Sequence, residues 1–173
     1  DKGWRMIING LQYLLFNSGP VRSQGVDCCS YINPENLKDS NDPKIKLYCF
    51  PIMYTDRDTK GIKLDHGLTL TSCLMNPKAR GEVKIQSSNP LDLPHINPNF
   101  LSHEDDIRNL LEGVKLARKV INTKPLSDIV IEEYCPGKNI TSDEDLINYC
   151  KKMVKTNWHP VGTCKMGKDD DDM

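Results

Sequence analysis

The chain has 173 residues, a length typical of a single domain with a hydrophobic core. Its 23 Lys and Arg residues nearly balance 24 Asp and Glu residues, and no basic cluster stands out, so the composition argues against a nucleic-acid partner. No apolar stretch is long enough to span a membrane. The sequence also lacks Gly-x-Gly-x-x-Gly, so we expect no dinucleotide-binding loop in it.

The first half of the chain is predicted to contain one helix followed by strands. Apolar residues recur at helical spacing over residues 3–16 and stop at a turn sequence, so we expect an amphipathic helix with a buried stripe. Residues 46–54 form an aromatic and aliphatic run that indicates a strand. Residues 66–74 and 80–87 alternate apolar with polar side chains, and we expect both to be half-buried strands of one antiparallel sheet.

The second half is predicted to be mainly helical. Ser102 is the expected N-cap of the clearest helix, whose apolar face we expect to lie across the sheet. A short strand is predicted at 129–131. A second helix at about 142–154 is predicted to begin with a capping box of Thr141 and Glu144. Strands in the middle with helices laid on one side predict an α+β fold.

The segment from Asn157 to Gly167 carries the strongest candidate for chemistry. Its single histidine, His159, follows an indole and precedes a proline and a turn of small residues, a pattern that holds an imidazole rigidly at a pocket edge. Trp158 either forms a wall of that pocket or fills a seam between two domains, and the sequence leaves both open. Cys164 is expected to pack rather than react. The remaining histidines, His66, His95 and His103, are expected to have surface or structural roles.

The seven cysteines form no Cys-x-x-Cys pair and do not alternate with histidines, so we expect no structural metal site. Asn139-Ile140-Thr141 is an N-glycosylation sequon in a loop ahead of a helix, where Asn139 is expected to be exposed. Together with the cysteine count it favours an extracellular, secreted glycoprotein. The alternative is a cytosolic chain with reduced thiols and an unused sequon.

Four segments ahead of His159 carry, in order with it, a resemblance to a known family. They are the turn at 18–27, the strand Pro43-Lys44-Ile45-Lys46-Leu47, the Pro-x-x-Arg-Gly sequence at 77–83 and the run at 92–101. With His-Pro-x-Gly-Thr at 159–163, they resemble the carboxy-terminal part of the glucose-methanol-choline (GMC) family of FAD-dependent oxidoreductases. The likeness covers nearly the whole chain from about Asn17, although Ala79 stands where the family usually has serine.

This resemblance implies a division of the chain. Residues 1–156 would form a substrate-binding domain with flanking helices, and residues 157–173 would begin the return to an FAD-binding domain. That domain would lie in the rest of a longer polypeptide, of which this chain is expected to be a fragment. The family's second catalytic His or Asn would lie beyond residue 173.

The resemblance also implies roles and reactions. His159 would be the catalytic base beside FAD, and Trp158 would contact cofactor and substrate. The expected reaction is oxidation of a small-molecule alcohol by an oxidase or dehydrogenase, because a neutral imidazole can accept the hydroxyl proton as hydride leaves carbon. A sugar, a choline-like alcohol or a cyanohydrin such as mandelonitrile remain possible substrates. The alternative is a hydroxynitrile lyase on the same FAD scaffold; a non-enzymatic binding domain is disfavoured by an aromatic content of 6%.

Overall fold

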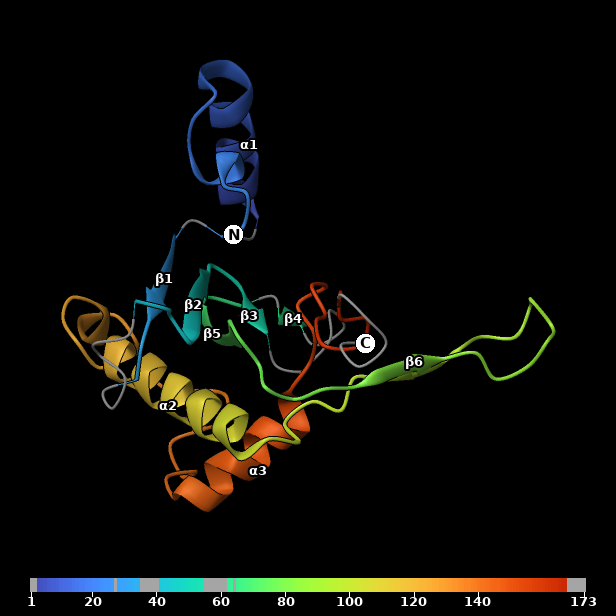
Figure 1. Ribbon diagram of the computed structural model, residues 1–173. Helices are drawn as coiled ribbons and strands as arrows, with labels where there is room; N and C mark the ends of the chain where they lie inside the picture. The colour runs from blue at the N-terminus through green and yellow to red at the C-terminus, as the bar shows by residue number, and fades with distance from the viewer. Residues whose placement is uncertain (1–2, 27, 35–40, 55–61, 64, 168–173) are drawn as a thin grey trace.

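The computed structural model describes residues 3–26, 28–34, 41–54, 62–63 and 65–167. Its centre is a three-stranded antiparallel sheet in the order β1 (Cys28–Ile32), β2 (Ile45–Phe50) and β5 (Thr69–Leu74) (Figure 1). Ile45 of β2 lies opposite Leu74 of β5. The Met75 N–H donates to the Lys44 carbonyl over 3.0 Å, which continues the ladder one step past the paired residues.

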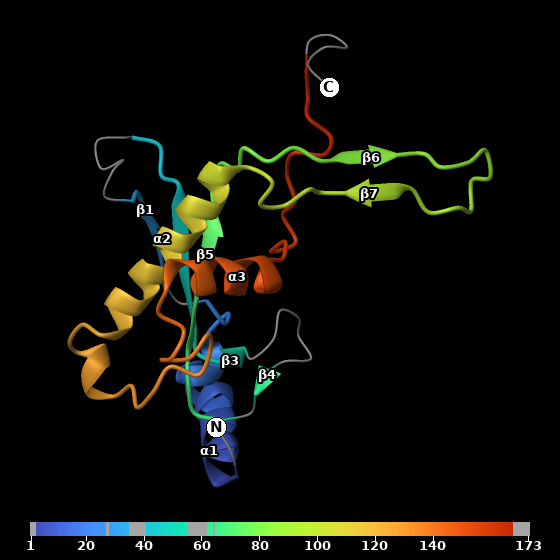
Figure 2. The same cartoon turned by 90° about the horizontal axis from the view of Figure 1, so that it is seen from below.

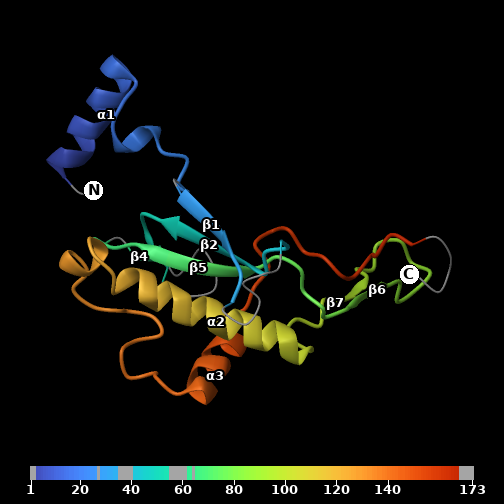
Figure 3. The same cartoon turned by 60° about the vertical axis from the view of Figure 1, so that its left-hand side comes forward.

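Two helices cover one face of this sheet. The long helix α2 (Glu104–Ile121) packs on β5 and β2. The helix α3 (Asp143–Met153) packs on the side of α2 that faces away from the sheet, as Figure 3 shows. The contact is close at Gly113, because a Cβ there would collide with the Ser72 hydroxyl. Leu110 and Cys150 join the two helices in the core, and burial raises the pKa of the Cys150 thiol to about 11. The α+β fold with helices on one side of an antiparallel sheet is confirmed.

The helix starts differ by one residue from those predicted. His103 rather than Ser102 caps α2, since its Nδ1 accepts the Asp105 N–H at 3.2 Å. Ser142 rather than Thr141 caps α3: its hydroxyl accepts the Asp145 N–H at 3.1 Å and donates to the Asp145 carboxylate at 2.7 Å. The capping box predicted for Thr141 is therefore wrong, and the N-cap lies one residue later, at Ser142.

The strand predicted at 80–87 does not join the central sheet. A short strand β6 (Glu82–Lys84) pairs with β7 (His95–Asn97) in a hairpin that extends away from the body (Figure 2). Ile85 is 89% exposed, so the prediction of a half-buried strand in one common sheet is wrong. The cause is that β5 ends at Leu74, after which the N–H groups of Lys78 and Ala79 hold the chain against Asp106 in the first turn of α2.

Two further segments depart from expectation. The strand predicted over 46–54 is divided into β2 and β3 (Met53–Tyr54), because Pro51 lacks the N–H that the ladder needs; β3 pairs with β4 (Ile62–Lys63). No strand forms at 129–131, where a 3-10 turn, η4 (Leu126–Asp128), leads into irregular backbone and Ile131 is 98% exposed.

The N-terminal helix α1 (Trp4–Phe16) forms as predicted, but it buries no residue. It packs on the short 3-10 helix η1 (Pro20–Arg22) and stands apart from the central sheet (Figure 1). The expected burial of its apolar stripe is therefore not found among the described residues. Among all the residues that the structure describes, no helix is both long enough and apolar enough to cross a bilayer.

Candidate functional site

After α3 the chain continues as irregular backbone that carries the candidate histidine. Trp158 has φ 57° and Gly162 has φ 94°, both in the left-handed region. Glycine adopts this region without strain, but a tryptophan seldom does. The strained residue, Trp158, thus directly precedes His159, and backbone strain of this kind is common at functional sites.

A chain of hydrogen bonds fixes the His159 segment to the helical layer. The Asp106 carboxylate, 2% exposed in the first turn of α2, accepts the N–H groups of Lys78 and Ala79 at 2.8 Å each. Two residues further on, the Gly81 N–H donates to the Gly162 carbonyl at 3.0 Å. A Cβ at Gly162 would lie 3.0 Å from the Ala79 carbonyl oxygen, so this close approach requires glycine. Asp106 therefore positions the turn at 78–81, and that turn positions the backbone beyond His159.

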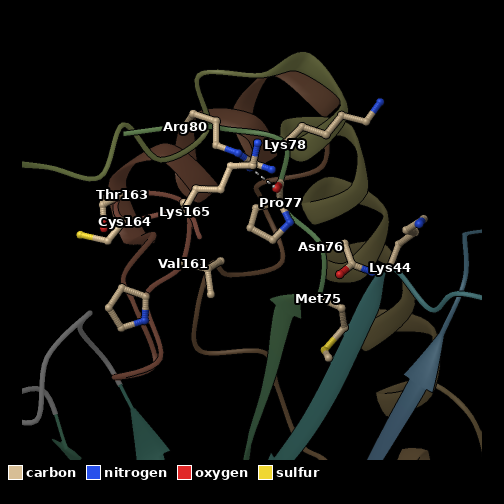
Figure 4. A pocket seen from close by; sticks show the side chains of 12 residues that line it. Lys44, Met75, Asn76, Pro77, Lys78, Arg80, Val161, Thr163, Cys164 and Lys165 are labelled. Atoms are coloured by element: carbon tan, nitrogen blue, oxygen red, sulfur yellow. Dashed lines mark hydrogen bonds between the residues drawn. The ribbon is translucent and has the colours of Figure 1, made fainter. Parts of the chain in front are cut away.

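An open groove of about 670 Å³ lies where this segment crosses the end of the sheet. Figure 4 shows Met75 at the sheet end of the groove, Val161 near its centre, and Arg80 with Lys165 on the side away from the sheet. The complete lining is Lys44, Met75, Asn76, Pro77, Lys78, Arg80, Pro160, Val161, Gly162, Thr163, Cys164 and Lys165. The lining contains basic side chains and no acidic ones, although Lys44 pairs with Asp42 at 2.8 Å on the rim.

The face of the sheet opposite α2 carries a row of aromatic rings. The ring centroids of Tyr48 and Phe50 lie 5.9 Å apart, and Phe50 meets Tyr54 edge-on at 5.6 Å. The Lys155 ammonium lies 5.3 Å from the Tyr54 ring and 5.8 Å from the Trp158 ring, which connects the row to the His159 segment. Tyr48, Phe50 and Tyr54 thus form an aromatic wall, which Lys155 links to Trp158, the residue before the candidate histidine.

His159 itself is exposed and makes no hydrogen bond to any other described residue. Trp158 is 72% exposed, so the described chain leaves one side of both rings uncovered. Such an imidazole is accessible to a ligand and able to accept a proton from it. Lys155 therefore links Trp158 to the aromatic wall, and His159 follows Trp158 in the chain, but neither residue lines the groove. The catalytic role of His159 stays a prediction.

Other residues singled out in the sequence lie elsewhere or behave differently. Asn139 is exposed in the turn ahead of α3, away from the groove lining. His103 has the structural role expected of it, as the cap of α2. Cys164 is exposed in the groove, so the expectation that it packs is wrong: no described residue covers it.

Asp106 is the positioning residue that the sequence analysis missed. It resembles an ordinary first-turn acid, which is usually exposed and interacts with the helix dipole. The available signal was its spacing, because Asp106 stands four residues before Leu110 and therefore on the buried face of α2.

The fold and the site together define a class: an α+β domain with one sheet face covered by helices and the other open beside an exposed histidine. Residues 77–173, more than half of the chain, match the family model described as GMC oxidoreductase. The chain belongs to the GMC oxidoreductase family. The family resemblance noted in the sequence is thereby confirmed.

Relatives and solved structures agree with this assignment. The chain is 30% identical to the alcohol dehydrogenase (acceptor) of Pseudomonas putida over 95% of its own length and 29% of that protein. It is 28% identical to the oxygen-dependent choline dehydrogenase of Pseudomonas aeruginosa (strain UCBPP-PA14), covering 98% of this chain and 30% of that protein. The chain thus spans about 30% of the length of these relatives.

The fold is shared with solved structures of low sequence identity. A formate oxidase superimposes with a TM-score of 0.80 at 22% identity, over 99% of this chain and 34% of that one. Pyridoxine 4-oxidase from Mesorbium loti superimposes with a TM-score of 0.74 at 23% identity, over 87% of this chain and 30% of that one. At these identities the likeness establishes the fold.

Proposed function

We propose that this chain supplies the substrate-facing wall and the catalytic base of an enzyme that oxidises an alcohol with FAD. The observation that carries the proposal is the exposed imidazole of His159, which lacks a hydrogen-bond partner among the described residues and follows Trp158, the residue that Lys155 links to the aromatic wall. Membership of the GMC oxidoreductase family supports the reaction class. The names of the relatives, an alcohol dehydrogenase and a choline dehydrogenase, support a hydroxyl group as the site of reaction.

The residues present fit one side of a flavin and not the whole cofactor. The exposed rings of Trp158 and His159 suit contact with a planar ring system, whereas the chain has no glycine-rich loop for the pyrophosphate. When bound, the flavin supplies the acceptor for the hydride. We therefore assign the remaining FAD contacts to the rest of a longer polypeptide, with residues 1–156 as the substrate domain and 157–173 as the return to the FAD domain.

The residues of this chain transfer the substrate proton and orient the histidine that accepts it. Neutral His159 accepts the hydroxyl proton of the substrate, which places negative charge on the oxygen as the C–H bond breaks. Pro160 and the bond between Gly81 and Gly162 limit the movement of the histidine backbone. A second His or Asn from the remaining polypeptide would complete the proton relay.

Anaerobic mixing of the full-length protein with alcohols tests this proposal. Loss of the flavin absorbance on adding a primary or secondary alcohol is the expected result, because hydride transfer reduces the ring. A panel of a sugar, a choline-like alcohol and mandelonitrile addresses the substrate. Release of aldehyde from mandelonitrile with the flavin still oxidised would instead establish the hydroxynitrile lyase, and a full-length protein without flavin would refute both.

A further inference from the structure

The open sheet face and the groove beside His159 belong to the same side of the molecule. Gly113 of α2 meets Ile45 and Ser72, so these residues mark the covered face. Strand residues alternate between faces, which puts Lys44 and Lys46 on the opposite, open face. Lys44 lines the groove together with Pro160 and its neighbours. Lys46 lies two residues further along β2, so the Cα atoms of Lys44 and Lys46 are about 7 Å apart at the usual rise of a strand.

Lys46 places a positive charge between two aromatic rings on this face. Its ammonium nitrogen lies 4.4 Å from the ring centroid of Tyr48 and 4.9 Å from that of Tyr31. The neighbouring Tyr31 and Tyr48 side chains raise the pKa of Lys46 above its usual value, and the side chain is charged at neutral pH. Within the described part of the chain, no carboxylate forms an ion pair with it.

Two aromatic rings whose centroids lie within 5 Å of a cation form the arrangement that binds the cationic head of a quaternary ammonium ligand. In this chain the protein's own ammonium occupies that place. A cationic alcohol near the groove would lose the aromatic faces as partners and would meet a like charge. A neutral alcohol meets no such repulsion, and an anionic alcohol gains an ion pair.

We propose that Lys46 is a specificity-determining residue that rejects cationic alcohols such as choline and admits neutral or anionic ones. The inference rests on the proposed function, since it takes the open face as the wall that meets the substrate. It names a substrate class for this site that differs from the choline named for some of the relatives.

Choline and its uncharged isostere 3,3-dimethylbutan-1-ol give the sharpest comparison, because they differ in the charge and hardly in shape. We expect the full-length enzyme to reduce its flavin with the isostere at least tenfold more efficiently, in kcat/KM, than with choline. Lys46→Met keeps the length and removes the charge, and it should reduce this ratio severalfold through the KM for choline. Lys119→Met removes an exposed charge from α2, on the covered side, and should leave the ratio unchanged.

Equal or better turnover of choline by the wild type would overturn the inference, as would an unchanged ratio in Lys46→Met. If the methionine variant fails to fold, Lys46→Gln provides the same loss of charge with a polar side chain. If no alcohol reduces the flavin, the proposed function fails; calorimetric dissociation constants for choline and the isostere then still decide whether Lys46 discriminates by charge.

Discussion

Asp106 and Lys46 acquire their roles from neighbours that are distant in sequence. Asp106 lies 28 positions from Lys78, whose N–H it binds, and Lys46 meets Tyr31 across a strand pair. The sequence pattern singled out His159 and Trp158 as candidates because their signal is local, a histidine between an indole and a proline. Spacing could have placed Asp106 on the buried face of α2, but spacing along one element does not reveal which backbone groups or rings another element brings near Asp106 or Lys46.

At this scale we predict that Asp106→Asn weakens the link between α2 and the turn at 78–81. The amide retains one acceptor but directs its NH₂ group at a backbone N–H, which leaves a buried donor unpaired. We expect the free energy of unfolding to fall by about 2–3 kcal/mol, measured by urea denaturation. Asp105→Asn, the half-buried neighbour whose ion pairs to Lys78 and Arg108 involve largely exposed partners, is the control and should have a much smaller effect. Equal losses in the two variants would contradict the positioning role.

At the scale of elements, the three helices were predictable and the strands only in part. A repeat of apolar residues over three or more turns marks a helix without reference to its surroundings, so α1, α2 and α3 were found within one or two residues. The strands β1 and β7 were missed because they are short and largely exposed, and thus lack a strong alternating pattern. β6 was predicted to join the central sheet but pairs with β7 instead. Strand pairing depends on where the preceding chain is held, and here Asp106 holds the turn at 78–81 against α2.

The contact between the turn at 78–81 and the His159 segment gives the prediction for this scale. Gly162→Ala places a methyl group against the Ala79 carbonyl in a left-handed conformation, so the segment must shift. We expect a loss of about 1–3 kcal/mol in unfolding free energy and slower flavin reduction with the flavin retained.

Gly10→Ala in α1 is the matched control, because no atom lies within 4 Å of its Cβ position and alanine favours the helix. It should leave the rate of flavin reduction unchanged. A Gly162→Ala variant that reduces flavin as fast as the Gly10→Ala variant would show that the segment tolerates the shift.

For the whole molecule, the sequence correctly predicted the α+β architecture and the family, but it misjudged α1. Its apolar stripe was expected to be buried, yet no residue of α1 is buried among the described parts of the chain. Periodicity shows that a helix has an apolar face, whereas the surface that covers that face depends on the rest of the polypeptide. The family was accessible because several short motifs occurred in a fixed order.

Location is also a property of the whole molecule, and we propose that the protein is secreted. Asn139 is exposed in its turn, which supports use of the sequon, and we expect it to carry a glycan. No disulfide joins the seven cysteines, although Cys28 and Cys49 lie directly opposite each other across β1 and β2 and are the pair best placed to form one. Mass spectrometry of the native protein after glycosidase treatment checks both. An unmodified Asn139 with every thiol alkylatable would point to a reducing compartment.

The central claim is that His159 accepts the substrate proton as the flavin is reduced. Stopped-flow measurement of flavin reduction in the full-length His159→Ala enzyme tests it most directly, with His66→Ala, an exposed histidine outside the groove, as control. We expect His159→Ala to keep its fold and its flavin spectrum while the rate of flavin reduction falls by about two to four orders of magnitude. A His159→Ala enzyme that reduces its flavin at the rate of the His66→Ala enzyme would contradict the account.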